Sequence, residues 1–431
     1  MRAQRLWVVS VRTVLATLVL SCGGTDDADS GGDQAGAPAA SCEPSPERCD
    51  GLGDERPGRL SEHTAVYDPE RLEMIVFGGT DTIPMACSFG GPVRFTGETW
   101  IYDDVCDAWT HVDQEVPPSG RHMAALGDGN MWVFGGRYRS EDAASGPYEI
   151  YDDLFRFDVA ARRWHEVEVS SERPPARVNG ALVWDDARDR LWLAGGNTSG
   201  DGAVYEPRAD LWSFEPEAGR WERHQPGGTL PPARLFHAGL YDAKRDALVI
   251  YGGADGSAFA NTASYFGDLW SLDLATLRWT ELHDGSGPAP DGRFWAGLVH
   301  DTETDTYLLF GGHDDQELGN RNDTWRYDPS EERWEQFDAG DRYRKPARDF
   351  CDFPPDFADI DDAMPERRNA HSLVWSPCGH ALTFGGKTDC GSTDDVWRFD
   401  GDGWIQRLQA TEGEVCLRWR DDPDRCGDLC F

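Results

Sequence analysis

Short apolar segments alternate with turn residues along most of the chain. Six of these segments end in a pair of glycines, whose first members are Gly78, Gly135, Gly195, Gly252, Gly311 and Gly385. Successive pairs lie 57 to 60 residues apart, except for a last interval of 74 residues. The segments lack a helical period and are bounded by Gly, Pro and Asp, which is typical of β-strands. The pattern therefore predicts six similar β units in tandem.

Each unit contains further residues in a shared order. After each glycine pair comes one of the strings TWIYDD, DLFRFD, DLWSFE, DLWSLD, DTWRYD or DVWRFD. A single tryptophan then follows, at Trp109, Trp164, Trp221, Trp279, Trp334 and Trp404. A Pro-rich turn and another apolar segment connect to the next unit. Each unit thus holds four strand-like segments, which predicts a four-stranded antiparallel sheet.

The glycine pair, the aromatic–Asp string and the single Trp resemble the kelch repeat over residues 59–409. Kelch repeats, which also build the central domain of galactose oxidase, fold as blades of a β-propeller. The resemblance implies an all-β fold, a six-bladed kelch β-propeller with four antiparallel strands per blade. It also implies that the repeated Gly, Trp and Asp are scaffold, as are His63, His237 and His371 of the first strand.

Loop lengths distinguish the two faces of such a propeller. Because strands alternate in direction, the 1–2 and 3–4 turns share one face, and the 2–3 and 4–1 loops share the other. The first set is short throughout, whereas the 2–3 loops are long and variable, as in residues 80–98 and 137–152. We call these the short-turn face and the long-loop face. Since loops on a rigid scaffold often carry function, the long-loop face is predicted to bind the ligand.

The N-terminus has the pattern of an export signal. Arg2, Arg5 and Arg12 precede the apolar run 13–20, which is too short to span a bilayer. The string Val-Leu-Ser-Cys ending at Cys22 resembles a bacterial lipobox. The alternative is an ordinary secretory signal with a chance cysteine. We predict a lipoprotein signal peptide over 1–21, lipidation of Cys22, a flexible Gly/Asp/Ala-rich tether over 22–58, the propeller over 59–409 and a Cys-rich tail over 410–431.

Charge narrows the class of partner. The chain has 431 residues and a formal net charge of −37, which argues against binding to nucleic acid or, through charge, to anionic lipid. We therefore expect membrane attachment only through the lipid, in a bacterial cell envelope, at the outer membrane or facing the periplasm. The expected partner is a glycan or a protein.

Cysteine usage agrees with export. Ten cysteines remain beside Cys22, and an even number in an exported chain favours disulfides. Cys351 and Cys390 fall in loops of the long-loop face in units five and six, so they are the best-supported pair. Cys42 and Cys49 are further candidates, because both tails carry cysteines that would form a covalent latch between or within them. The spacing lacks a zinc-binding pattern.

Five arginines precede the first strand of their units: Arg121, Arg177, Arg234, Arg293 and Arg368. With that strand innermost, they would ring the mouth of the channel and bind carboxylates of acidic sugars or peptides. Phe236 and Trp295 follow two of them and would stack on a sugar ring. The alternative is structural, because an acid begins the third strand of each unit and would pair with these arginines between blades.

No catalytic motif occurs, so we expect a binding protein rather than an enzyme. The predicted function is that of a membrane-anchored, exported kelch lipoprotein that binds a glycan or protein through its long-loop face. The alternative is an exported carbohydrate-active or copper-dependent, oxidase-like enzyme, because galactose-oxidase-like proteins with copper share the fold. Its copper ligands have no assignable counterpart here. A third hypothesis is a structural module of an envelope complex. No cofactor or metal site is predicted, with Ca²⁺ in acidic loops or Cu as the alternatives.

Overall fold

A computed structural model describes residues 41–81, 94–114, 116–143, 146–260, 262–314, 319–343, 358–359, 361–388 and 391–411. Six antiparallel four-stranded sheets dominate these residues, and one of them gains a short fifth strand. The one helix among them, α1 (Pro46–Cys49), is a single turn capped by Ser45. None of the described helical residues forms a helix long and apolar enough to cross a membrane.

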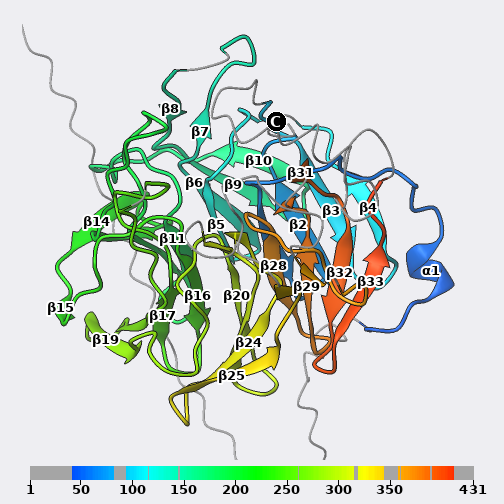
Figure 1. The fold of residues 1–431 in the computed structure, drawn as a ribbon. Helices are drawn as coiled ribbons and strands as arrows, with labels where there is room; N and C mark the ends of the chain where they lie inside the picture. Colours follow the sequence, from blue (N-terminus) through cyan, green and yellow to red (C-terminus); the bar gives the residue numbers. More distant parts are fainter. Residues whose placement is uncertain are drawn as a thin grey trace, which may run out of the picture. The chain divides into compact units, whose positions relative to one another are not determined.

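Each sheet is built from one continuous stretch of chain (Figure 1). Blade 1 contains β1 (Thr64–Asp68), β2 (Glu73–Phe77), β3 (Thr99–Asp103) and β4 (Ala108–His111). Blade 2 contains β5 (Met123–Gly127), β6 (Asn130–Phe134), β9 (Leu154–Asp158) and β10 (Arg163–Glu166). Blade 3 contains β11 (Ala181–Asp185), β12 (Arg190–Ala194), β13 (Leu211–Glu215) and β14 (Arg220–His224).

The remaining three blades repeat this order. Blade 4 contains β16 (Ala238–Asp242), β17 (Ala247–Tyr251), β18 (Leu269–Asp273) and β19 (Arg278–His283), with β15 (Gly227–Gly228) parallel to β19. Blade 5 contains β20 (Gly297–Asp301), β21 (Thr306–Phe310), β24 (Thr324–Asp328) and β25 (Arg333–Asp338). Blade 6 contains β28 (Ser372–Ser376), β29 (His380–Phe384), β32 (Val396–Phe399) and β33 (Trp404–Leu408).

The first strands of the blades form a closed ring. Contacts run from β1 to β5, β11, β16, β20 and β28 and return from β28 to β1. The first strand is therefore innermost and the fourth outermost, as the order of each sheet requires. The sequence-based prediction of a six-bladed β-propeller with four antiparallel strands per blade is confirmed.

Repeated tryptophans join each blade to the blade before it. Trp164 of β10 packs on Phe77 of blade 1, with ring centres 4.6 Å apart, and donates its Nε1 hydrogen to Thr99 Oγ1 at 2.8 Å. Trp404 packs in the same way on Phe310, at 4.4 Å. These side chains are almost fully buried, and a large buried aromatic contributes several kcal/mol through burial. The scaffold role predicted for the single Trp is thus explained by its position between blades.

The glycine pairs are required by backbone conformation and by space. In blade 4, Gly252 and Gly253 have φ of 68° and 94°, a region that side chains rarely adopt. A Cβ on Gly253 would lie 2.6 Å from the carbonyl oxygen of Leu235. This tight backbone lets the Gly253 N–H reach the Arg293 carbonyl in blade 5, at 2.8 Å.

That hydrogen bond recurs in all six blades. The second glycine always donates to a carbonyl shortly before the first strand of the next blade, over 2.8–3.1 Å. We call the six acceptors the clasp residues: Leu60, Ser119, Arg177, Arg234, Arg293 and Arg368. The last bond, from Gly386 to Leu60, joins blade 6 to blade 1 and closes the ring.

Residues 41–59 cross the boundary between blades 1 and 6, and we call them the seam clamp. Cys42 is bonded to Cys378 in the β28–β29 turn, and Cys49 to Cys106 in the β3–β4 turn. Arg48 Nε also lies 2.9 Å from Asp103 Oδ2. Residues 41–58, assigned to a flexible tether from the sequence, are thus held against the propeller (Figure 1).

The cysteine candidates differ in outcome. Cys42 and Cys49 each form a disulfide, but with a blade cysteine rather than with one another or with the C-terminal tail. Local sequence carries no sign of this pairing, because each partner is a lone cysteine in a blade turn. Cys351 and Cys390 lie outside the described residues, as do Cys22 and most of the tail over 410–431.

The long 2–3 loops continue the blades beyond the glycine pairs. Small hairpins form from β7 (Arg137–Tyr138) with β8 (Glu149–Ile150), β22 (His313–Asp314) with β23 (Gly319–Asn320), and β30 (Lys387–Thr388) with β31 (Gly391–Ser392). A further pair, β26 (Arg342–Tyr343) with β27 (Ala358–Asp359), lies in the connection between blades 5 and 6. Single bridges occupy the equivalent place in the other blades, so this face carries ordered structure of its own.

Four histidines occupy the same position beside the first strand: His63, His122, His237 and His371. All are buried, and burial lowers the pKa of each imidazole from 6.5 to about 3. Below pH 6.5 the unfolded chain therefore binds protons that the folded chain does not. The stability contributed by these neutral rings is complete above pH 6.5 and declines as the pH falls toward 3.

Acidification from pH 6.5 to 5 should therefore lower the free energy of unfolding before most carboxylates titrate. Each buried histidine contributes up to about 1.4 kcal/mol per pH unit. His237→Ala, which copies Ala296 at the same position in blade 5, should reduce this slope in urea unfolding monitored by Trp fluorescence. Replacement of the exposed His165 by Ala is the matched control. Equal slopes for the His237→Ala variant and the unmodified protein would contradict the assignment.

Candidate functional site

Six residues just before the innermost strands form a ring on the long-loop face. These ring residues are Glu62, Arg121, Asn179, Phe236, Trp295 and Ala370. Each has a positive φ, between 49° and 63°. Each donates its backbone N–H to the carbonyl of the ring residue in the preceding blade, over 2.9–3.3 Å. The backbone is thus fixed by a closed circle of hydrogen bonds, whereas the side chains differ in every blade.

The side chains of ring residues meet across this circle. The Arg121 guanidinium of blade 2 lies over Trp295 of blade 5, with Cζ 4.5 Å from the ring centre, and 5.5 Å from the centre of Phe236. Phe236 meets Trp295 edge-on at 4.5 Å, and Trp295 Nε1 donates to Asn179 Oδ1 at 3.3 Å. Cation–π contacts of this kind stabilise by about 0.5–2 kcal/mol, more when desolvated.

Glu62 supplies the counter-charge. Its carboxylate accepts from Arg121 Nη2 at 2.7 Å and from Arg137 Nη2 at 3.0 Å. Burial alone would raise the pKa of Glu62, but the charges and hydrogen bonds of the two arginines outweigh burial and hold this pKa well below its usual range. We call Glu62, Arg121, Arg137, Phe236 and Trp295 the mouth cluster. In this cluster the rings of Phe236 and Trp295 lie beside the ion pairs that Glu62 forms with Arg121 and Arg137. The side chains of these ion pairs are about nine-tenths buried.

Four of the five arginines that were predicted to ring the channel mouth do not line it. Arg177, Arg234, Arg293 and Arg368 are clasp residues, and their side chains are at most 2% exposed. Each pairs with the aspartate before the third strand of its own blade, not of a neighbouring blade. In blade 4, Arg234 Nη1 and Nη2 donate to the two carboxylate oxygens of Asp268 at 2.7 and 2.8 Å. Their guanidinium groups thus hold the blade together rather than line the mouth.

The same Arg–Asp unit recruits two further groups. Arg234 Nη1 also donates to the Gly252 carbonyl, at 2.9 Å, and Trp270 Nε1 donates to Asp268 Oδ2. The pairs Arg177–Asp210, Arg293–Asp323 and Arg368–Asp395 make equivalent contacts. Buried bidentate pairs with all remaining donors satisfied are typical of structural ion pairs.

Arg121 is distinct because of its register. It directly precedes His122, whereas Arg234 precedes His237 by three residues. Counted from the shared histidine, Arg121 aligns with Glu62, Phe236 and Trp295 rather than with Arg234. The structure therefore brings together Arg121, Phe236 and Trp295 from the seven predicted ligand-binding residues.

Sequence reasoning missed Glu62, Asn179 and Arg137. Alignment on the histidines would have found Glu62, since Glu62 precedes His63. Asn179 precedes Gly180 instead, and it is found by its place two residues after Arg177, which matches the place of Phe236 after Arg234. Arg137 follows the glycine pair of blade 2, a position whose closeness to the channel shows only in three dimensions.

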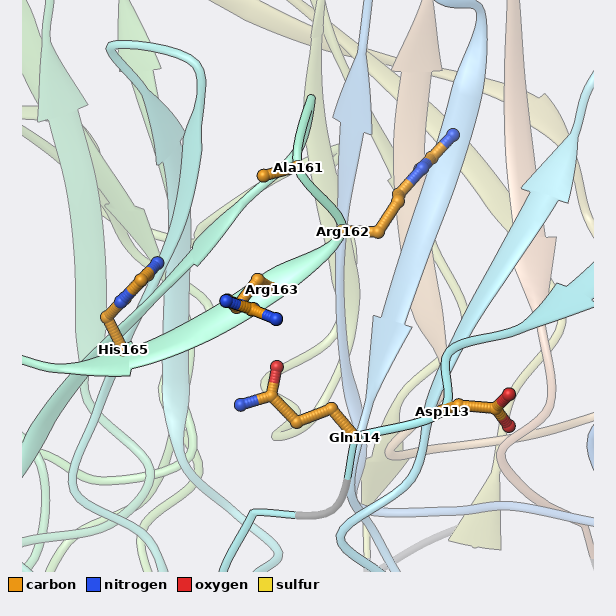
Figure 2. A pocket seen from close by; sticks show the side chains of 6 residues that line it. All are labelled: Asp113, Gln114, Ala161, Arg162, Arg163 and His165. Carbon is orange, nitrogen blue, oxygen red and sulfur yellow. The ribbon is translucent and has the colours of Figure 1, made fainter.

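A shallow depression of about 480 Å³ lies at the outer edge between blades 1 and 2 (Figure 2). Its lining includes Gln114, whose side chain is directed toward β10 and pairs with the backbone N–H and carbonyl of Trp164 at 2.9 and 3.2 Å. Asp113 points away from these groups (Figure 2). Gln114 thus covers the open edge of β10, so this depression is explained by edge protection rather than by ligand binding.

Metal ligands are not grouped in the part of the chain that the structure describes. Within those ranges, no set of three or more His, Cys, Asp or Glu side chains is arranged to hold a metal ion. The Asp and Glu residues of the sites above are instead engaged by arginine, tryptophan or backbone donors.

Comparisons with known proteins agree with the blade architecture. The Kelch-repeats domain of KLHDC2, KLHL20 and DRC7 matches residues 48–188 and 187–352. The chain is 26% identical over 291 residues to a leucine-zipper-like transcriptional regulator 1 homolog of Drosophila melanogaster. This match covers 64% of this chain and 26% of that protein. It is 27% identical over 274 residues to host cell factor 1 of Homo sapiens, covering 59% of this chain and 12% of that protein.

Two further similarities complete this picture. Kelch domain-containing protein 10 of Rattus norvegicus is 25% identical over 217 residues, covering 47% of this chain and 48% of that protein. The chain thus spans about half or less of the length of these relatives. The solved structure of YjhT superposes with a TM-score of 0.58 at 14% identity, covering 82% of this chain and 99% of that one, which is a likeness of fold.

Arg234→Ala should lower the free energy of unfolding by about 3–5 kcal/mol, because it leaves Asp268 buried without its cation. Arg223→Ala, at an exposed arginine 5.9 Å from the centre of Trp212, is the control and should change stability by less than about 1 kcal/mol. Urea unfolding measures both. A small loss for Arg234→Ala would show that the pair is not structural and would return this arginine to the set of ligand candidates.

Proposed function

Because the chain belongs to the kelch-repeat family of β-propellers, we propose that it works as a binding scaffold that holds a protein ligand on its long-loop face. The mouth cluster carries this proposal. The ring residues share one backbone conformation, and yet their side chains differ from blade to blade. The scaffold residues, by contrast, repeat. Variation of side chains on a fixed backbone is what a recognition surface requires.

The chemistry of the mouth cluster favours a ligand with acidic groups. Arg121 and Arg137 lie in an aromatic setting with Glu62 as their shared partner. Aromatic and arginine side chains supply most of the binding energy at protein interfaces. An acidic glycan is the second candidate, favoured by the partly exposed Trp295 beside Arg121, since such a ring stacks on sugars. Among the described residues, no comparable cluster of contacts supports the alternative of an enzyme.

We also propose that the chain is exported and anchored through a lipid on Cys22, in a bacterial cell envelope. The pairs Cys42–Cys378 and Cys49–Cys106 support an oxidising compartment. The pattern of residues 1–22 supports the lipid.

Site-specific photocrosslinking tests the binding face. A benzoylphenylalanine at Val204, which is 60% exposed in the 2–3 loop of blade 3, should form protein adducts in intact cells. The same group at Glu217, in the β13–β14 turn of the short-turn face, is the matched control and should form few. Trp295→Ala should reduce the Val204 adducts at least tenfold without loss of folded protein.

Adducts from Glu217 alone would overturn the choice of face. Absence of protein adducts from Val204, together with specific binding to acidic sugars on a glycan array, would replace the protein ligand by a glycan.

Metabolic labelling with an alkyne-tagged palmitate tests the anchor. The unmodified chain, expressed in a bacterium with lipoprotein processing, should take up the label and fractionate with membranes. Cys22→Ser should abolish labelling, whereas Cys42→Ser should leave it intact. Labelling that persists in Cys22→Ser would contradict the proposed site of lipidation.

A further inference from the structure

A second arginine-rich contact lies beside the mouth cluster, in the hairpin of β7 and β8. The string Arg137-Tyr138-Arg139 begins this hairpin, and Tyr148 lies at its other end. The Arg137 and Arg139 guanidinium carbons lie 3.9 and 4.4 Å from the centre of the Tyr148 ring. Tyr148 also donates its backbone N–H to the Gly200 carbonyl of blade 3, at 2.6 Å. The hairpin is therefore held in place by the neighbouring blade.

Among the described residues, Arg139 is buried and has no acidic partner. The residue is only 7% exposed to solvent, and its Nη1 donates a hydrogen bond to the Gly146 carbonyl at 3.1 Å. Its Nε and Nη2 atoms have no hydrogen-bond partner among the described residues. The N–H bonds of these two nitrogens run parallel along one edge of the guanidinium. Both atoms are shielded from solvent, so a ligand reaches this edge by displacing the residues that cover it. That edge matches the two oxygens of a carboxylate.

The charges around Arg139 are also out of balance. Arg121, Arg137 and Arg139 supply three positive charges, and within the described ranges Glu62 is the carboxylate that pairs with the first two. The rest of the chain is strongly acidic, with a net charge of −37. A buried, unpaired arginine is costly, and an anion that binds to it recovers much of that cost.

We propose that the Nε–Nη2 edge of Arg139 is an anion subsite that binds a carboxylate of the ligand, with the Tyr148 ring and the Gly146 carbonyl holding the guanidinium. This subsite extends the proposed function, because the same ligand would contact Arg139 and the mouth cluster. The carboxylate belongs to an acidic residue of a protein ligand. A carboxylate on a sugar has the same chemistry, and the experiment distinguishes these two sources.

Arginine Nε–Hε resonances test the subsite directly. The full chain, labelled with ¹⁵N-arginine, is titrated at constant ionic strength with N-acetylglutamate and with glucuronate. The uncharged controls are N-acetylglutamine and glucuronamide. The Arg139 resonance, assigned by its loss in Arg139→Gln, should shift and saturate with a carboxylate and respond at least tenfold more weakly to the matching amide.

Two variants separate the subsite from the fold and from the mouth cluster. Arg139→Lys keeps the positive charge but lacks the two parallel N–H donors of the guanidinium, and should weaken carboxylate binding about tenfold or more. Arg223→Gln removes an arginine near Trp212 on an outer strand and should leave binding unchanged. Binding should persist in Trp295→Ala, so the subsite remains testable if that variant shows the mouth cluster to be inactive.

The outcomes are decisive. Saturation by N-acetylglutamate supports the subsite with a peptide source, and saturation by glucuronate alone supports it with a sugar source. No saturable shift, an equal shift with the amides or with chloride, or unchanged binding in Arg139→Gln would overturn it.

Discussion

The hydrogen bond from the second glycine of each pair to a clasp residue of the next blade is the interaction on which the structure depends. It fixes the angle between neighbouring blades, because the donor follows the second strand of one blade directly and the acceptor lies only a few residues before the first strand of the next. It also requires a left-handed backbone at the glycines, which explains why this pair recurs in every unit. The clasp residue then places a ring residue two positions later. Scaffold and recognition surface thus share one short segment.

The boundary between blades 1 and 6 is the place where the first and last blades must be joined to close the ring. In the part of the chain that the structure describes, every blade is made from one continuous stretch, and no strand is exchanged where the ring closes. Backbone bonds of the repeated kind, from Gly386 to Leu60 and from Glu62 to Ala370, hold this boundary. A buried cluster adds to them, since Asp104 of blade 1 accepts from Tyr67 at 2.7 Å and contacts His380 of blade 6 at 2.9 Å.

The seam clamp reinforces this boundary covalently. Its disulfides link residues 336 and 57 positions apart in the sequence, and cross-links that close long loops stabilise most by restricting the unfolded chain. A propeller of contiguous blades thereby gains a closure that does not depend on packing alone.

The fold was predictable because its determinants repeat. A periodic pattern is visible without any knowledge of distant contacts, so the glycine pairs and single tryptophans led to six blades. The site was less predictable, because its residues are the ones that break the pattern. Arg121 resembled Arg234 in sequence and occupies a different register, as alignment on His122 and His237 shows.

The contacts of Arg137 and Cys106 could not be predicted from the local sequence pattern, for a related reason. Each depends on which segments the closed ring brings side by side, and no spacing in the sequence records that. Burial also separates arginines that look alike. Arg234 has an aspartate partner within its own blade, whereas Arg139 has no such partner among the described residues.

The seam clamp also determines the face on which the described part of the chain begins. Cys378 and Cys106 lie in a 1–2 turn and a 3–4 turn, so Cys42 and Cys49 are fixed at the short-turn face. Ser41, the first of the described residues, therefore lies on the side opposite the mouth cluster. Covalent closure and ligand recognition are thus assigned to opposite faces, so the side chains of the long-loop face can differ from blade to blade without disturbing the disulfides that join blades 1 and 6.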